Sequence, residues 1–176
     1  MLPTLNTKRT KLYSLATEDF DELLAMYQEP DSNKFIPPLR DKTPTEQLAF
    51  LHLKIKQNQA NNGLGTWSIR TKDQQQLIGT ANVNEFPPLN FIHLGIHLRR
   101  SVWGQGYATE IVKTLKDYAL NDLKIKQIHA VVSVEHHASR KMLEKAGLVY
   151  QKEVAFGEDI IAVYAQNSSF YVIHNE

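Results

Sequence analysis

A glycine-rich turn at Gly104 and Gly106 constrains this chain more than any other feature. An apolar run at 91–98 precedes the turn, and a helical pattern at 108–120 follows it. A turn that leads into a helix leaves several backbone N–H groups without partners, and the helix dipole adds partial positive charge there. The turn therefore predicts an anion site, for which a phosphate or pyrophosphate is the best ligand.

Three interpretations of this turn are open at this point. It is a tight connection without a ligand, a dinucleotide-binding turn, or a coenzyme A pyrophosphate loop. The dinucleotide turn requires a third Gly or Ala where this chain has Thr109, and a parallel strand before the turn. A P-loop is excluded, because no Gly-Lys-Ser/Thr follows the glycines.

The order of strand and helix patterns decides against the dinucleotide fold. The strands before the turn follow one another through short connections, which makes them antiparallel and excludes an opening βαβ unit. The strand that follows the third helix is parallel to the strand before it. The expected strands are 10–15, 65–71, 77–86, 91–98, 125–134, 148–156 and 160–166. The expected helices are 18–28, 44–59, 107–121 and 136–146.

Composition excludes several kinds of protein and site. The net charge of +1 argues against a dedicated nucleic-acid binder, and the basic cluster of Lys8, Arg9 and Lys11 is expected on a solvated strand face. Because cysteine is absent, disulfides, thiolate zinc sites and Cys nucleophiles are impossible. No apolar segment approaches ~18 residues, and the N-terminus lacks a signal-peptide core. We expect one cytoplasmic domain over residues 1–176, a monomer or homodimer, without membrane or nucleic-acid partners.

The turn has a specific sequence, Trp-Gly-Gln-Gly-Tyr-Ala-Thr-Glu, from Trp103 to Glu110. Within this order of elements it resembles the GNAT superfamily of acetyl-CoA-dependent N-acetyltransferases, and most closely the RimJ/RimL branch. The family's phosphate-loop pattern is Arg/Gln-x-x-Gly-x-Gly/Ala; Gly106 and Ala108 fill its last positions, and Trp103 replaces its first. The resemblance covers about residues 8–167 and implies an α/β (α+β) fold, with a mixed, mostly antiparallel seven-stranded sheet flanked by about four helices.

A second motif, from His136 to Leu148, is similar to the family's Asn-x-x-Ser-x-x-x-x-Glu-Lys-x-Gly-Phe. His136 stands where the family usually has Asn, which affects a hydrogen bond that Asn often makes to the cofactor. Leu148 stands where the family usually has Phe, which is a change in packing. The resemblance implies that Ser139 lies near the thioester.

The resemblance also implies how acetyl-CoA is held. Backbone N–H groups of the loop bind the pyrophosphate, while the strands at 91–98 and 126–134 splay apart to admit the pantetheine arm. Ile96 and Leu98 then offer backbone hydrogen bonds and an oxyanion donor, and Gly95 marks a bulge that opens the splay. The expected cofactor-binding residues are Ile96, Leu98, Val102, Trp103, Gly104, Gln105, Gly106, Tyr107, Ala108, Thr109, His136 and Ser139.

Candidates for the general base are Glu85, His93 and His97. Glu85 lies where a strand meets a proline-rich loop, near the expected acceptor site. The two histidines are four apart on a strand and share a face if no bulge intervenes. No third ligand accompanies them, so we expect no metal site. Glu158 and Asp159, on the last hairpin, are further candidates that could reach the acceptor.

The proton donor to the leaving thiolate is expected to be Ser139, with Tyr164 as an alternative. The catalytic residues predicted are therefore Ser139, Glu85 and His93.

The reaction that the resemblance implies is direct attack of a primary amine on the thioester of acetyl-CoA. A protein α-amine titrates near ~7.8 and a lysine near ~10.4, so a chain without an obvious strong base fits a protein N-terminal acceptor. The alternatives are a small-amine enzyme, acting on a polyamine or an aminoglycoside, and a non-catalytic acyl-CoA-binding module. Loops 29–43 and 86–90 are expected to choose the acceptor.

Overall fold

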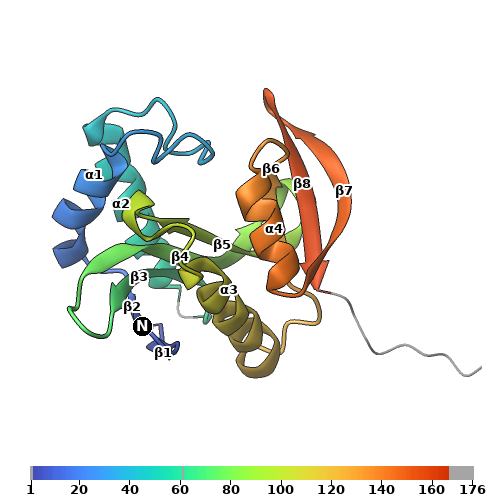
Figure 1. Ribbon diagram of the computed structural model, residues 1–176, viewed down its shortest axis with the longest axis horizontal. Coiled ribbons are helices and arrows are strands. Elements are labelled where there is room, and N and C mark those ends of the chain that lie inside the picture. The colour runs from blue at the N-terminus through green and yellow to red at the C-terminus, as the bar shows by residue number, and fades with distance from the viewer. Residues whose placement is uncertain (1, 61, 167–176) are drawn as a thin grey trace, which may run out of the picture.

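A mixed sheet of eight strands forms the centre of the computed structural model, which describes residues 2–60 and 62–166 (Figure 1). The strands lie in the order β1-β2-β3-β4-β5-β6-β8-β7. Neighbouring strands are antiparallel except for β5 and β6, which are parallel. The strands are β1 (Leu5–Asn6), β2 (Thr10–Ser14), β3 (Gly65–Thr71), β4 (Leu77–Phe86), β5 (Phe91–Leu98), β6 (His129–Ser133), β7 (Leu148–Phe156) and β8 (Asp159–Gln166).

Helices cover both faces of the sheet. The α-helices of the described residues are α1 (Phe20–Tyr27), α2 (Pro44–Asn58), α3 (Tyr107–Asp117), which a π-helical turn at Tyr118–Asp122 continues, and α4 (His137–Lys145). α1 and α2 lie on one face, and α3 and α4 lie on the other (Figure 1). The alternation along β4 explains this arrangement, because Ala81 and Val83 pack with Ile111 of α3, whereas the side chains at 80, 82 and 84 point to the opposite face. Within the described residues, no helix has the length and apolar character that crossing a membrane requires.

The sheet has one strand more than the seven expected. The additional strand, β1, has two residues, and they pair with Leu12 and Lys11 of β2. Two residues are too few for a period-2 pattern, so this strand has no signal in the sequence. The α/β class, the mostly antiparallel sheet and the four helices are confirmed.

The parallel junction between β5 and β6 is short. Only two residue pairs join the strands, His93 with His129 and Leu94 with Ala130, and beyond them the strands diverge. The bulge expected at Gly95 is wrong, because the register between β4 and β5 is unbroken. Gly95 instead makes room for a side chain, since a Cβ there would lie 2.6 Å from Oδ1 of Asn82.

Asn58 fastens the end of α2 to β3, and we expect its loss to destabilise the protein. Its buried amide donates to the Thr66 carbonyl and accepts from the Thr66 N–H, both at 2.8 Å. Asn58→Ala would leave the buried Thr66 N–H without this partner and would remove one of the two hydrogen bonds to the Thr66 carbonyl, which also accepts from the Leu15 N–H at 3.1 Å. The change should lower the free energy of unfolding by about 1–3 kcal/mol. Urea unfolding measures the change, with exposed Gln59→Ala as the control. Equal stability of the two variants would contradict the expectation.

Candidate active site

The glycine turn leads directly into the N-terminus of α3, and both of its glycines have a backbone conformation that other residues rarely adopt. Gly104 has φ = 73° and Gly106 has φ = 83°, and Gly106 is the N-cap of α3. No side chain caps this end of the helix. The N–H groups of Tyr107, Ala108 and Thr109 are therefore available to an anion, together with the positive end of the helix dipole.

Trp103 attaches this turn to the end of β5. Its indole N–H donates to the Leu98 carbonyl at 2.8 Å, although 43% of the side chain remains exposed. Trp103, which stands at the Arg/Gln position of the loop pattern, therefore holds the turn against the end of β5. One acceptor position of the Leu98 carbonyl is consequently already occupied.

A cavity of about 400 Å³, the loop cavity, lies at the turn between the N-termini of α3 and α4. Eleven of the twelve residues expected to bind the cofactor line it. These are Ile96, Leu98, Val102, Trp103, Gly104, Gly106, Tyr107, Ala108, Thr109, His136 and Ser139. The exception is Gln105, whose exposed side chain turns away and donates to the Ser101 carbonyl at 2.9 Å. His136 and Phe35 both line this cavity, and their rings stack with centroids 4.2 Å apart. Burial lowers the pKa of His136.

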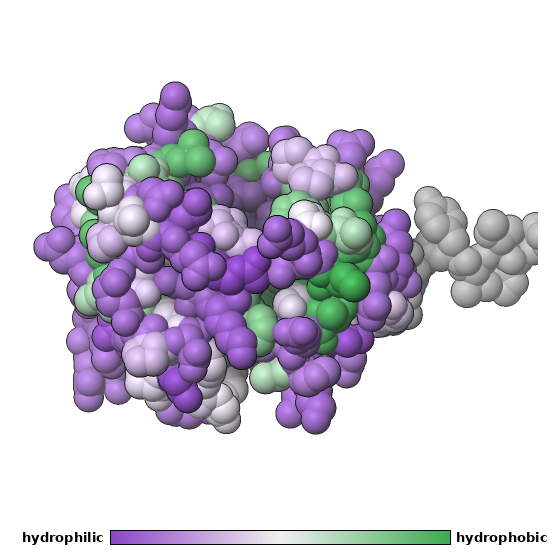
Figure 2. All heavy atoms as spheres, turned by 90° about the horizontal axis from the view of Figure 1, so that it is seen from above, coloured by the Kyte–Doolittle hydropathy of each residue, from purple (hydrophilic) through white to green (hydrophobic). Residues whose placement is uncertain are grey.

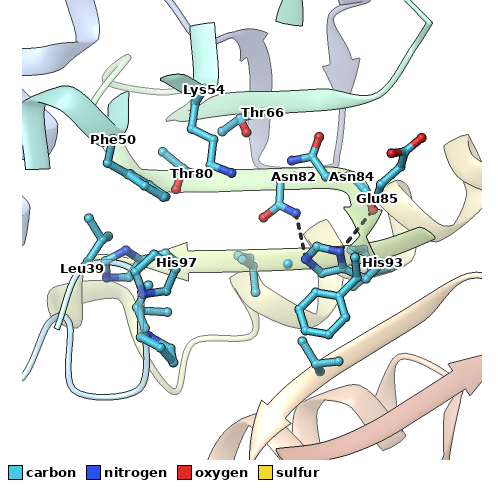
Figure 3. A pocket seen from close by; sticks show the side chains of 18 of the residues that line it. Leu39, Phe50, Lys54, Thr66, Thr80, Asn82, Asn84, Glu85, His93 and His97 are labelled. Atoms are coloured by element: carbon cyan, nitrogen blue, oxygen red, sulfur yellow. Dashed lines mark hydrogen bonds between the residues drawn. The ribbon is translucent and has the colours of Figure 1, made fainter. Parts of the chain in front are cut away.

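A second cavity of about 540 Å³, the sheet cavity, lies on the other side of β5. Its floor is a polar row on β3, β4 and β5, formed by Thr66, Thr80, Asn82, Asn84 and His93 (Figure 3). Its other walls come from α2, β6, β8 and both loops expected to choose the acceptor, 29–43 and 86–90. Its volume suits a small ligand or a few residues of a peptide, since such pockets measure about 300–1,000 Å³.

The two cavities meet where β5 and β6 diverge. Phe35, Ile36, Ile96 and His97 line both of them. Seen from above, hydrophobic side chains gather on the side of the molecule that carries β6–β8, and the rest of this face is mostly hydrophilic (Figure 2). Because the two cavities share residues, a ligand that extends from the glycine turn between the diverging strands β5 and β6 would reach the sheet cavity.

Two neutral histidines lie in the sheet cavity, on one face of β5. The Nδ1–H of His93 donates to the Asn84 carbonyl at 3.1 Å, which leaves Nε2 as an acceptor (Figure 3). Nε2 of His97 lies 2.8 Å from the Ser32 carbonyl, and its ring stacks on Tyr27. Burial lowers the pKa of each ring to about 4. In the described part of the chain, no group of three His, Asp or Glu side chains could hold a metal.

The other candidates for the base lie at the margin of this cavity or away from it. Glu85 lines its edge, but its side chain is exposed and points away from His93 (Figure 3). Asp159 also lines the cavity, and Arg40 holds it with hydrogen bonds of 3.0 and 2.7 Å. Glu158 is exposed and lines neither cavity.

The two candidates for the proton donor, Ser139 and Tyr164, lie in different surroundings. Ser139, on the first turn of α4, lines the loop cavity. Tyr164 is fully buried and lines neither cavity; its hydroxyl contacts Arg140 at 3.1 Å and Glu144 at 3.4 Å. Ser139 is therefore the better-placed donor of the two.

Arg9 lines neither cavity but contacts the glycine turn, which the sequence did not reveal. It was expected on a solvated strand face, which is wrong, because its guanidinium stacks over the Tyr107 ring at 4.0 Å and donates to the Gln105 carbonyl at 3.0 Å. It also pairs with Glu110 at 2.9 Å. Burial raises the pKa of Glu110, but hydrogen bonds from Thr7 and Arg9 outweigh it and hold that pKa below its usual value. A contact across about a hundred residues has no local signal in the sequence.

Arg9→Met should weaken binding of coenzyme A roughly tenfold, because it removes a cation and leaves the Glu110 carboxylate without its counter-ion beside the phosphate loop. Titration calorimetry at two salt concentrations measures this loss, which should be smaller at high salt. Exposed Lys8→Met is the control. If the two variants bound coenzyme A equally well, Arg9 would have no part in the site.

Comparisons with known proteins agree with this geometry. The model of the acetyltransferase (GNAT) domain family matches residues 9–149. The uncharacterized N-acetyltransferase p20 of Bacillus licheniformis is 31% identical over 172 residues, covering 93% of this chain and 94% of that protein. A crystal structure of an acetyltransferase from Agrobacterium tumefaciens is 26% identical, with a TM-score of 0.79 and 94% of each chain covered.

The fold is also that of RimL, a ribosomal L7/L12 alpha-N-protein acetyltransferase solved in complex with coenzyme A. This structure has a TM-score of 0.78 at 15% identity, and the match covers 93% of this chain and 97% of that one. The motif from Trp103 to Glu110, the fold and the family match lead to one conclusion. This chain belongs to the GNAT family and is an N-acetyltransferase.

Proposed function

We propose that this enzyme transfers the acetyl group of acetyl-CoA to the α-amine at the N-terminus of a protein, as the RimJ/RimL branch does. The observation that carries the proposal is the meeting of the loop cavity and the sheet cavity at Ile96 and His97. A donor held at the phosphate loop and an amine held in the sheet cavity would meet there.

The residues of the loop cavity fit acetyl-CoA. The uncapped start of α3 suits the pyrophosphate, and the diverging edges of β5 and β6 suit the amide-bearing pantetheine arm. When bound, acetyl-CoA supplies an activated acetyl thioester. Backbone at Ile96 and Leu98 borders the place where the thioester would lie.

In this proposal, the amine nitrogen attacks the thioester carbonyl carbon, a C–N bond forms, and the C–S bond breaks. His93 accepts the proton from the nitrogen after attack has begun, when that nitrogen becomes much more acidic. Ser139 relays a proton from water to the leaving thiolate and so keeps its hydroxyl, and the protonated His93 releases its proton to water. Glu85 is the second candidate for the base, and its exposed position requires an intervening water.

Two further points support a protein α-amine as the acceptor. RimL, which shares the fold, is named for this chemistry on a ribosomal protein. The bases of the sheet cavity are weak, since burial lowers the pKa of His93 to about 4. A weak base suits an amine that is already partly neutral at physiological pH, as an α-amine with a pKa of about 7.8 is.

A free-thiol release assay with a panel of acceptors tests the proposal. Release with short N-terminal peptides, and little with polyamines or aminoglycosides, is the expected result. Thiol release with a polyamine but not with the peptides would contradict the proposal and favour an enzyme that acts on small amines. Stabilisation by coenzyme A in a thermal shift assay, without thioester cleavage on any amine, would indicate the non-catalytic module.

A further inference from the structure

Lys54 brings a positive charge into the sheet cavity. It lies on α2, above β3 and β4, and its side chain reaches over the polar floor toward Thr80 and Asn82 (Figure 3). The Nζ atom lies 5.0 Å from the centroid of the Phe50 ring and donates to Oε1 of Gln57 at 3.2 Å. Burial lowers its pKa, which means that the ammonium is partly removed from water at this position.

No carboxylate in the described residues neutralises this charge. The ion pairs found within 2–60 and 62–166 do not include Lys54. Of the carboxylates that line the sheet cavity, Asp159 is already paired with Arg40, and Glu85 is exposed at the edge. Arg40, the other cation that lines this cavity, is held by Asp159, so the Lys54 ammonium is the positive charge here that has no carboxylate partner among the described residues.

The polar floor also holds groups that lack partners. Asn84 and Thr66 line the sheet cavity, and each has a buried atom, Nδ2 of Asn84 and Oγ1 of Thr66, without a hydrogen-bond partner among the described residues. A buried polar atom without a partner costs free energy, so such atoms beside a cavity favour a polar ligand there. Both can donate a hydrogen bond to an oxygen atom.

We infer that the acceptor is an amine that also carries a carboxylate, and that Lys54, with the donors of the cavity floor, binds that carboxylate. The inference rests on the proposed function, since it concerns the acceptor of the same reaction. The carboxylate can be an acidic side chain near a peptide N-terminus or the α-carboxylate of a free amino acid. A polycationic acceptor would instead meet like charge at Lys54.

Matched acceptor pairs test this inference by thiol release. The pairs are Glu-Ala-Ala against Gln-Ala-Ala, Ala-Glu-Ala against Ala-Gln-Ala, each with an amidated C-terminus, and free alanine against alaninamide. The acidic member of at least one pair should show a kcat/KM roughly tenfold higher, because charge-assisted hydrogen bonds contribute on that scale. The pair that responds identifies the source of the carboxylate.

Substitution of Lys54 then assigns the preference to this side chain. Lys54→Met should bring the acid-to-amide ratio of kcat/KM close to one, mainly through KM, and Lys54→Arg should restore part of it. Exposed Lys56→Met, on the same helix, should leave the ratio unchanged. Coenzyme A affinity measured for each variant shows that it is folded.

Several results would overturn the inference. Equal kcat/KM within every pair would do so while leaving the proposed function intact, because thiol release with the amides reports that function separately. An acid-to-amide ratio of kcat/KM that is unchanged in Lys54→Met would also overturn the inference. Acetylation of Lys54 itself in the absence of an acceptor would overturn it as well. If no amine supports thiol release, the proposed function fails. Calorimetry of the coenzyme A complex with Ala-Glu-Ala and Ala-Gln-Ala amides would then decide whether Lys54 binds a carboxylate.

Discussion

Gly106→Val should weaken coenzyme A binding by about 100-fold or more, the loss expected when roughly two hydrogen bonds to a charged phosphate are removed. Valine is strained at φ = 83°, and relief of that strain would turn the N–H groups of α3 away from the ligand. A Cβ at this position would lie 3.5 Å from Nη2 of Arg9, which is ordinary van der Waals contact, so the strain of the backbone carries the expected effect. Titration calorimetry measures the affinity.

Gly157→Val is the matched control for this change. Gly157 also has a positive φ, 62°, with nothing within 4 Å of an added Cβ, and it lies in the distant turn between β7 and β8. The two variants should lose similar thermal stability, while only Gly106→Val loses affinity. A folded Gly106→Val protein that bound coenzyme A within about threefold of the wild type would show that the turn is a simple connection.

His93→Ala should lower kcat roughly 100-fold, the lower end of what a general base contributes, with little change in coenzyme A affinity. The ring is oriented by its bond to the Asn84 carbonyl, and its Nε2 faces the sheet cavity, where it accepts a long hydrogen bond of 3.5 Å from Nδ2 of Asn82 that a substrate would replace. His129→Ala is the control, because His129 pairs with His93 across the strand junction but lines neither cavity. Equal losses in the two variants would argue for a structural role of both rings.

The pH dependence of the wild-type rate follows from the same ring. Burial lowers the pKa of His93 to about 4, the bond to Asn84 acts in the opposite direction, and the charge of Lys54 adds to the lowering. A base needs its unprotonated form, so His93 is competent above about pH 5, and activity from this group is lost only as pH falls through about 4. The inflection in kcat/KM should therefore belong to the acceptor, near ~7.8 for an α-amine. An inflection near ~6.5 that disappears in His93→Ala would contradict the lowered pKa.

Local features of the fold could be predicted because short stretches of chain determine them. The strands at 65–71, 77–86, 91–98 and 148–156 and the turn into α3 begin and end where their patterns do. Steric constraint at Gly104 and Gly106, together with the apolar periods on either side, is enough to specify that unit. The two-residue β1 and the role of Gly95 required knowledge of neighbouring strands.

Features of the site that depend on distant contacts could not be predicted. Arg9 lies beside the loop only because the segment before β2 contacts the start of α3 in the folded protein. Lys54 enters the sheet cavity only because α2 packs over β3. Glu85 was a reasonable candidate by its position in the sequence, yet it lies at the edge of the cavity with its side chain exposed. Pairing and burial in three dimensions decide such roles, and a local pattern does not report them.

The short junction between β5 and β6 implies that acetyl-CoA, once bound, would also stabilise the sheet. With only two residue pairs at this junction, the sheet consists of two blocks, β1–β5 and β6–β8, that share few backbone hydrogen bonds. A pantetheine arm lying in the splay would act as a partial extra strand and fasten the blocks together. Since residues of both blocks line the sheet cavity, its shape would be fixed only after the donor has bound. We therefore expect substrates to bind in order, with the donor first.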